Sequence, residues 1–255
     1  DLMASLTIAV PTLELVRPAL DDLAAIYFTS GSTGPSKGVK ITRRMISAVQ
    51  AAISAHWPFL KHQRPVICDW LPWHHVFGGL DNFFKMLWTG GTYHIRSVPT
   101  ADTIATTARQ MAELQPTVFV DVPLGIKFLL DELQTDPMLC ASFLARLELI
   151  FFAGAGMDAE TWTRLNRFVE ENKQLCQSSL RIASGYGSTE SGSTICLSHE
   201  APSSPSEIGL PLPGLSLRLA EVDGRLEARI RGPNISPGYL SDSGSSEMPV
   251  DDRGF

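Results

Sequence analysis

The chain has 255 residues, 44% of them hydrophobic, so it can bury a sizeable core in one or two domains. Its formal net charge of −6 gives no basic footprint for nucleic acid or for an anionic membrane surface, and we expect neither partner. No apolar run approaches the ~18 residues that a membrane span needs, and no basic-then-apolar signal segment opens the sequence.

Apolar segments alternate with helical patterns along the first 200 or so residues. The predicted strands are 24–28, 65–71, 92–95, 117–122, 149–152 and 180–183, and the predicted helices are 42–56, 80–90, 103–114, 124–133, 141–147 and 159–170. Strands that are apolar throughout and separated by helices indicate a parallel sheet with helices on both faces. In such a sheet ligands bind beyond the carboxyl ends of the strands.

The pattern changes after the segment 201–206, which is rich in proline and serine. Leucines alternate with polar residues over 215–219, Asp223-Gly224 predicts a hairpin turn, and the alternation resumes over 226–230. The predicted fold class is therefore α/β, a mostly parallel sheet flanked by helices on both faces in residues 1–205. A small antiparallel β subdomain follows in residues 206–255, and we expect both parts to be truncated, one at each end of the chain.

A loop dense in glycine and hydroxyl groups follows the first predicted strand and reads Thr-Ser-Gly-Ser-Thr-Gly-Pro-Ser-Lys-Gly over 29–38. Glycine lets backbone N–H groups approach an anion closely, the hydroxyls add donors, and Lys37 adds a full charge. The helix predicted from Thr42 would direct its N-terminus at the same anion. The Walker sequence of P-loop NTPases does not fit, because it needs glycine at Ser36 and a hydroxyl residue at Gly38.

Two more glycine-containing loops follow predicted strands. The stretch 184–190 reads Ser-Gly-Tyr-Gly-Ser-Thr-Glu, in which Tyr186 can stack on a purine, Thr189 can bond a phosphate or ribose oxygen, and Glu190 can hold Mg²⁺. The other loop, Gly154-Ala155-Gly156, follows the strand predicted over 149–152. Taken alone, a strand end with Tyr and Glu is more often structural than functional, and 154–156 can be a plain strand-to-helix turn.

His74 and His75 lie in an aromatic setting that could suggest a metal site. Two sequence neighbours usually point apart, however, and no ligand triplet at metal-binding spacing accompanies them. The segment that holds them is therefore more informative about a substrate than about a metal.

These stretches resemble the signatures of the adenylate-forming (AMP-binding) superfamily, which contains acyl-CoA synthetases, the adenylation domains of peptide synthetases and luciferases. The family loop Thr-Ser-Gly-Ser/Thr-Thr-Gly-x-Pro-Lys-Gly is matched over 29–38, except that Ser36 stands at the family's proline. The family's Tyr-Gly-x-Thr-Glu is matched completely over 186–190. The segments 154–156, 209–214, 231–234 and 238–239 agree in the same order, so the resemblance covers nearly the whole chain from residue 24 onward.

The resemblance implies ATP-dependent activation of a carboxylic acid to an acyl adenylate, followed by transfer to coenzyme A as a thioester. It gives catalytic roles to Lys37, Thr189, Glu190 and His75, with Mg²⁺ held by Glu190. It also places the nucleotide on Thr29, Ser30, Gly31, Ser32, Thr33, Gly34, Lys37, Gly154, Ala155, Gly156, Gly185, Tyr186, Gly187 and Thr189. The acid, ATP and CoA are the expected small-molecule partners. Because a carboxylate is already ionised at neutral pH, activating it needs mainly positioning and electrostatics.

The segment 71–79, Leu-Pro-Trp-x-His-x-Phe-Gly-Gly, is most similar to feruloyl-CoA synthases within the superfamily. The resemblance implies that His75 lines the acyl channel and moves when CoA enters. With Trp73, Phe77 and the nearby loop 120–123, it favours a flat aromatic, hydroxycinnamate-like acid over a long-chain fatty acid.

The family also has a large segment before its glycine loop, and a ribose-binding aspartate and a catalytic lysine after the point where Phe255 stands. The resemblance thus implies an internal fragment of the family's large N-terminal domain, which we expect to be inactive or nearly so alone. Four widely spaced cysteines without a CxxC pair favour reduced thiols and a cytoplasmic location. Two other readings stay open: an adenylation domain that loads a carrier protein, and a non-catalytic nucleotide-binding relic.

Overall fold

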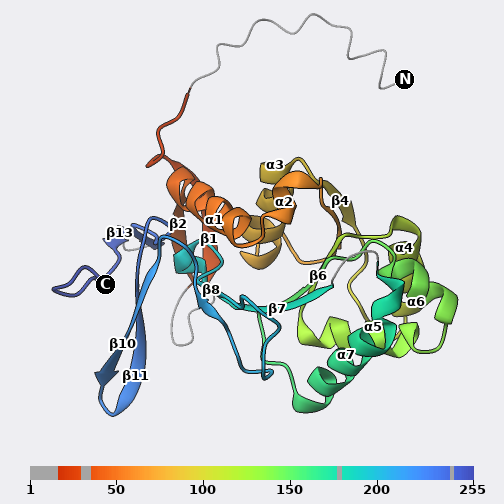
Figure 1. The fold of residues 1–255 in the computed structure, drawn as a ribbon. Helices are drawn as coiled ribbons and strands as arrows, with labels where there is room; N and C mark the ends of the chain where they lie inside the picture. The colour runs from red at the N-terminus through yellow and green to blue at the C-terminus, as the bar shows by residue number, and fades with distance from the viewer. Residues whose placement is uncertain (1–16, 30–35, 177–179, 242–243) are drawn as a thin grey trace, which may run out of the picture.

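The computed structural model describes residues 17–29, 36–176, 180–241 and 244–255 (Figure 1). Its strands are β1 (Leu23–Thr29), β2 (Lys37–Thr42), β3 (Val66–Asp69), β4 (Thr92–Ile95), β5 (Val118–Asp121), β6 (Leu149–Phe152), β7 (Arg181–Tyr186), β8 (Cys196–Leu197), β9 (Leu210–Pro211), β10 (Ser216–Val222), β11 (Arg225–Arg231), β12 (Gly238–Ser241) and β13 (Gly244–Glu247). Its α-helices are α1 (Arg43–His56), α2 (Phe59–His62), α3 (Phe84–Thr89), α4 (Ile104–Leu114), α5 (Pro123–Leu133), α6 (Pro137–Leu144) and α7 (Ala159–Asn172). The described residues also contain a π-helix, η2 (Phe77–Phe83), and two 3₁₀ turns, η3 (Lys173–Leu175) and η4 (Thr189–Ser191).

The central sheet has the strand order β4-β3-β5-β6-β7-β8-β9, and β3 to β7 are parallel within it. Successive side chains of a strand point to opposite faces. On β6, Ile150 and Phe152 pack with α4, α5, α6 and α7, whereas Leu149 and Phe151 pack with α1, α2 and α3. Figure 1 shows these two groups of helices on opposite sides of the sheet. The predicted α/β class, with helices on both faces, is confirmed.

The first predicted strand does not belong to this sheet, and in this respect the prediction was wrong. β1 pairs antiparallel with β2, and both join β12 and β13 in a separate sheet of order β1-β2-β12-β13. The glycine-rich loop thus connects a hairpin, and the six residues of β2 separate it from α1. The first-turn amides of α1 are not free for an anion either, since Arg43 N and Arg44 N donate to the carbonyls of Asp22 and Leu20.

The antiparallel hairpin near the C-terminus is confirmed. β10 and β11 pair from Ser216↔Arg231 to Val222↔Arg225. Asp223 and Gly224 have φ values of 51° and 73°, as the tight turns favoured in two-residue hairpins require. β9 and β12, which follow residue 205, hydrogen-bond to strands of the first segment. The division of the chain at residue 205 stays a prediction.

Two helices differ from their predicted ranges by more than two residues. The helix predicted over 80–90 is divided into η2 and α3, and a π-helical bond from Asp81 N to Val76 O marks the wider turn. The helix predicted over 141–147 begins earlier, because Asp136 caps it with Oδ1 accepting from two backbone amides at 3.0 Å and Pro137 occupies its first turn.

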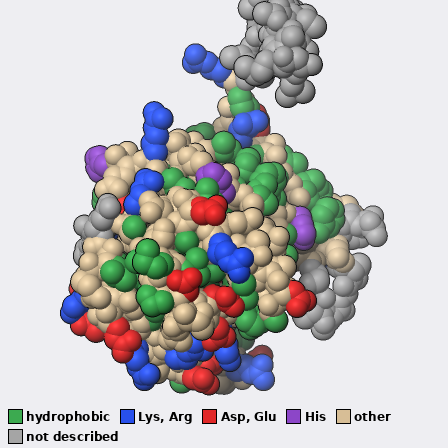
Figure 2. All heavy atoms as spheres, turned by 90° about the vertical axis from the view of Figure 1, so that its right-hand side faces the viewer, with side chains coloured by type: hydrophobic (Ala, Val, Ile, Leu, Met, Phe, Trp, Pro, Cys, Tyr) green, Lys and Arg blue, Asp and Glu red, His purple; other side chains and the backbone are tan. Residues whose placement is uncertain are grey.

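The surface carries both signs of charge. On the face shown in Figure 2, acidic and basic side chains are interspersed and are most frequent toward the lower edge of the view. Within the described residues, no helix has the length and apolar character required to cross a membrane. Cys68, Cys140, Cys176 and Cys196 are all free thiols.

Candidate active site

The carboxyl ends of β6 and β7 place two predicted loops next to each other. Parallel pairing of the two strands aligns Phe152 with Ser184, so the residues that follow each strand emerge at one edge. Between them lies a cavity of about 430 Å³, which we call the wide cavity. It is lined by residues 152–156, 184–187 and 205–208. Gly154, Ala155, Gly156, Gly185, Tyr186 and Gly187 are thus brought together as predicted.

A second cavity, of about 50 Å³, shares part of its lining with the first, and we call it the narrow cavity. Both are lined by Ala153, Gly154 and residues 185–187. The narrow cavity is closed by His75, Val76 and Phe77 from the start of η2, by Phe151 of β6, and by Ser193 and Thr194. Phe77 and Phe151 meet edge to face at 5.7 Å. Tyr186 remains 45% exposed, so its ring is available to a ligand that passes between the cavities.

His75 stands at the wall of the narrow cavity as a neutral imidazole. Its Nδ1 accepts a hydrogen bond from the Phe77 backbone N–H at 3.3 Å. Burial lowers the pKa of His75, and the neighbouring His74 lowers it further. Within the described ranges, no three His, Cys, Asp or Glu side chains form a group that could hold a metal ion.

We expect folding stability to fall as pH drops through about 6.5, the ordinary histidine pKa. Burial also lowers the pKa of His56 on α1. A histidine whose pKa is lower in the folded state binds fewer protons there than in the unfolded chain, so acid favours unfolding. The stabilisation from each neutral ring is present above pH 6.5 and is lost between 6.5 and the lower folded pKa. Urea unfolding at pH 7.5 and 5.5 measures the loss, and His56→Gln should reduce it; an unchanged pH dependence would contradict this assignment.

The tight turn after β7 carries Thr189 and Glu190. Ser188 and Ser191 cap it reciprocally, with Ser188 N donating to Ser191 Oγ at 3.1 Å. The backbone carbonyl of Glu190 accepts from Ser236 N at 2.8 Å, which ties the turn to the segment before β12. These bonds fix the position of the Glu190 backbone.

Glu190 and Lys37 meet at a third side chain, Tyr239. The Tyr239 hydroxyl donates to Glu190 Oε1 at 3.2 Å, and the Lys37 ammonium lies 5.6 Å from the centre of the Tyr239 ring. Pairing of β12 with β2, in which Tyr239 opposes Val39, brings this tyrosine between them. Burial and the nearby carboxylate raise the pKa of Tyr239 to about 12, so it remains a hydrogen-bond donor.

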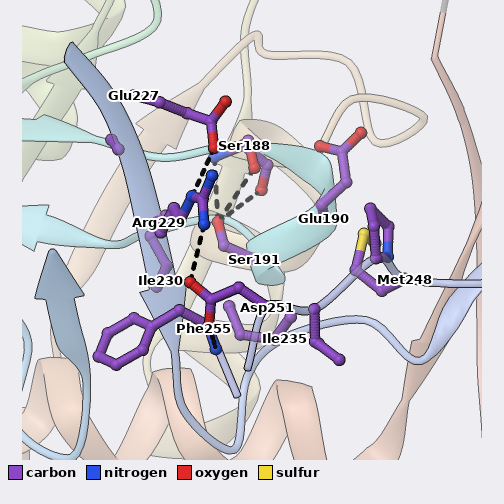
Figure 3. A pocket seen from close by; sticks show the side chains of 13 residues that line it. Ser188, Glu190, Ser191, Glu227, Arg229, Ile230, Ile235, Met248, Asp251 and Phe255 are labelled. Atoms are coloured by element: carbon purple, nitrogen blue, oxygen red, sulfur yellow. Dashed lines mark hydrogen bonds and ion pairs between the residues drawn. The ribbon is translucent and has the colours of Figure 1, made fainter. Parts of the chain in front are cut away.

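Glu190 also lines a third cavity of about 390 Å³, the hairpin cavity, beside β11 and the segment 248–251 (Figure 3). There Arg229 bonds both Glu227 and Asp251, and its guanidinium lowers the pKa of Asp251 to about 2. Figure 3 shows the Glu190 carboxylate directed away from these paired charges. Within the described residues it has no ion-pair partner. Tyr186 lines the wide and narrow cavities, whereas Glu190 lines the hairpin cavity.

Part of the predicted phosphate loop cannot be compared, since Ser30, Gly31, Ser32, Thr33 and Gly34 lie outside the described residues. The loop's two ends are paired strand residues: Thr29 opposes Lys37, and Thr29 Oγ1 donates to the Lys37 carbonyl at 3.4 Å. The loop therefore starts and finishes on the same sheet that carries Tyr239.

Sequence reasoning missed Tyr239, Phe151 and Thr194. Phe151 was expected only as a strand residue, and nothing in its neighbourhood distinguishes it from Phe152, which points to the opposite core. Tyr239 belongs to the segment 238–239, which agrees with the family but was given no role in the site. Its place in this matched segment is the sequence feature that could have indicated a role beside Glu190.

Comparisons with known proteins agree with one another. Residues 5–240 match the family described as AMP-binding enzyme. The chain is 26% identical over 239 residues to a mitochondrial malonate–CoA ligase of Mus musculus, covering 87% of this chain and 39% of that enzyme. It is 24% identical over 243 residues to a long-chain-fatty-acid–CoA ligase of Salmonella typhimurium, covering 89% of this chain and 40% of that enzyme.

Solved structures show the same fold. A malonyl-CoA ligase complex with methylmalonyl-CoA and AMP bound superposes with a TM-score of 0.71 at 24% identity, over 92% of this chain and 52% of that chain. A long-chain-fatty-acid–CoA ligase of Archaeoglobus fulgidus superposes with a TM-score of 0.73 at 20% identity, over 95% of this chain and 49% of that chain. The chain thus spans about two-fifths of the length of the curated relatives reported above.

Proposed function

This chain belongs to the AMP-binding enzyme family, and from that premise we propose that the protein containing it activates a carboxylic acid with ATP and passes the acyl group to CoA. The observation that supports this most directly is that Gly185, Tyr186 and Gly187 line both the wide and the narrow cavity. An adenylate has a nucleotide part and an acyl part joined at one phosphate. Two cavities that share one wall can hold the two parts of such a molecule.

In this proposal the nucleotide base lies in the wide cavity against the Tyr186 ring, with the backbone of 154–156 opposite. The acid lies in the narrow cavity, and its carboxylate attacks the α-phosphorus of ATP near Thr189. The new bond joins carboxylate oxygen to phosphorus, and the bond that breaks releases pyrophosphate. Lys37 and the loop 30–34 hold the β- and γ-phosphates. These residues act by position and charge, because no proton has to move in this step.

Mg²⁺ fits Glu190 by donor chemistry. One oxygen of this carboxylate accepts from Tyr239, and within the described residues the other accepts no hydrogen bond. Mg²⁺ prefers oxygen ligands and is usually bound through one or two carboxylates together with substrate phosphates, so a site with a single protein carboxylate suits it. When bound, the ion would neutralise phosphate charge, while Tyr239 holds the carboxylate in place.

For the acid itself we propose an aromatic, hydroxycinnamate-like compound. Phe77 and Phe151 wall the narrow cavity, and Trp73 packs at 4.9 Å from Phe83 just outside it. A flat aromatic acid packs well against the edges and faces of these side-chain rings. The four free cysteines suit a reducing compartment such as the cytoplasm.

We expect the full-length protein to release pyrophosphate from ATP with ferulate, coumarate or benzoate faster than with octanoate or malonate. The assay measures pyrophosphate over this panel, with and without CoA. Equal or faster turnover of octanoate or malonate would overturn the aromatic preference but not acid activation. Pyrophosphate release that CoA does not affect would favour loading of a carrier protein, and no release with any acid would overturn the enzymatic proposal.

A further inference from the structure

A continuous chain of buried polar side chains lies beneath the narrow cavity. It consists of Asp69, Asp81, Asn82 and Lys85, which are 0%, 1%, 0% and 1% exposed. We call it the buried polar chain. Lys85 forms an ion pair with Asp81 and lies 3.4 Å from Asn82 Oδ1, and Asn82 donates to Asp69 at 2.8 Å. Every member is bonded to the next, so the charges are held in one arrangement.

One end of this chain reaches a wall of the narrow cavity, and the other end is bonded to the segment before His75. At one end Thr194 Oγ1 donates to Asp81 Oδ2 at 2.8 Å, and Thr194 lines the cavity. At the other end Asp69 accepts from the Tyr93 hydroxyl at 2.7 Å, and Tyr93 accepts from Trp73 Nε1 at 3.2 Å, two residues before His75.

Asp81 and Asn82 are also part of the π-helix η2, whose first residue, Phe77, lines the same cavity. Single π-helical turns occur frequently at functional sites. Gln50 of α1 supports this turn, with Nε2 donating to the carbonyls of Leu80 and Asp81 at 2.9 and 3.3 Å.

Stability alone does not account for the buried polar chain. Taking charges out of water costs several kcal/mol per ion. Replacing a buried ion pair with apolar residues of similar volume often leaves folding stability unchanged or raises it. A fully bonded polar network does, however, fix one geometry, because every alternative leaves a buried group unpaired. Here that geometry includes two walls of the narrow cavity.

We propose that Asp81 is a positioning residue for the acid. It acts by fixing the positions of the Thr194 hydroxyl and of the η2 turn, which both contribute to the wall of the narrow cavity. The inference rests on the function proposed above. It predicts that the Asp81–Thr194 bond affects recognition of the acid and leaves recognition of ATP, whose base we place in the wide cavity, nearly unchanged.

The test uses Thr194→Val, which keeps the side-chain shape but removes the hydroxyl, and Thr194→Ser, which keeps the hydroxyl. In the full-length enzyme we expect Thr194→Val to raise KM for the best acid roughly tenfold, the effect of losing one buried hydrogen bond. KM for ATP should change less than about twofold, and Thr194→Ser should restore the wild-type KM for the acid. Asp81→Ala removes the acceptor of the Thr194 hydroxyl and should also raise KM for the acid, and combining it with Thr194→Val should raise that KM little further, because both variants lack the Asp81–Thr194 bond.

Arg96→Gln is the matched control, since the Arg96–Asp121 pair is equally buried and neither residue lines the narrow cavity. This variant should lose stability without changing KM for the acid. If Thr194→Val raises both KM values alike, if Thr194→Ser fails to rescue, or if Arg96→Gln raises KM for the acid as much, the positioning role is wrong while acid activation stands. A wild-type enzyme that activates no acid would instead overturn the proposed function, and this inference with it.

Discussion

Replacing Gly187 with alanine should lower the free energy of unfolding by about 3 kcal/mol or more, the upper end for overpacking, and abolish acid activation. A Cβ atom on Gly187 would lie 1.4 Å from the carbonyl oxygen of Ser193 and 2.5 Å from its carbonyl carbon. These are backbone atoms, which cannot rotate away as a side chain could. The turn that carries Thr189 and Glu190 would have to open.

The consequences extend to both ligand cavities, because Gly187 lines the wide and the narrow cavity. The opposing strand segment is held by Ile195 N donating to Tyr186 O at 2.8 Å and by Ser193 N donating to Ser188 O at 3.2 Å. Moving Ser193 away breaks these bonds. Ser193 already has a φ of 124°, so little conformational freedom remains there.

Gly156→Ala is the matched stability control. An added Cβ on Gly156 would meet no atom within 4 Å, and its φ lies outside the left-handed region. It should leave the urea midpoint unchanged or raise it slightly, because alanine restricts the unfolded chain. A Gly187→Ala protein with a wild-type midpoint and full pyrophosphate release would show that the approach of Gly187 to Ser193 is not as close as described.

The parallel core was predictable because its pattern is strong. β5 and β6 are short, wholly buried strands between helices, a pattern typical of a parallel sheet covered on both faces. The positions of Gly154 and Tyr186 at one edge followed from this arrangement. So did the placement of the His75 segment after β3.

The hairpin of β1 and β2 was not predictable from local pattern. β2 reads Lys-Gly-Val-Lys-Ile-Thr, in which Val39 and Ile41 alternate with polar residues, but it follows a glycine loop as the helix of a phosphate-binding unit would. Pairing of β2 with β12, about 200 residues later, determines that residues 37–42 form a strand and not a helix. Contacts at that separation leave no trace in local periodicity.

The buried polar chain could not be foreseen for a related reason. Asp81 and Lys85 are spaced by four residues, which is typical of an ion pair on an exposed helical face. Their burial follows from the position of η2 between α1 and the segment 193–194, a tertiary contact. The motif around Glu190 was recognised, whereas its bond to Tyr239 depends on the same pairing of β12 with β2.

Replacing Glu190 with glutamine should reduce the rate of acid activation by on the order of 10²-fold or more, the usual effect of removing one charged stabilising group from an active site. Glutamine keeps the size of the side chain and an oxygen that can accept from Tyr239, so the turn should stay folded. What it removes is the negative charge of the carboxylate, which we propose holds Mg²⁺. The Mg²⁺ concentration for half-maximal pyrophosphate release should rise accordingly, and chelation of the metal should stop wild-type turnover.

Two further variants separate this charge from the surrounding structure. Tyr239→Phe keeps the Glu190 carboxylate with its charge and removes only its hydrogen bond, so the Mg²⁺ concentration for half-maximal pyrophosphate release should change less than in Glu190→Gln. Glu221→Gln makes the same chemical change on the exposed side of β10 and should leave the rate and the Mg²⁺ dependence unchanged. If Glu190→Gln has the wild-type Mg²⁺ dependence, the metal is held elsewhere, and the carboxylate serves to fix the Tyr239 side chain between Glu190 and Lys37.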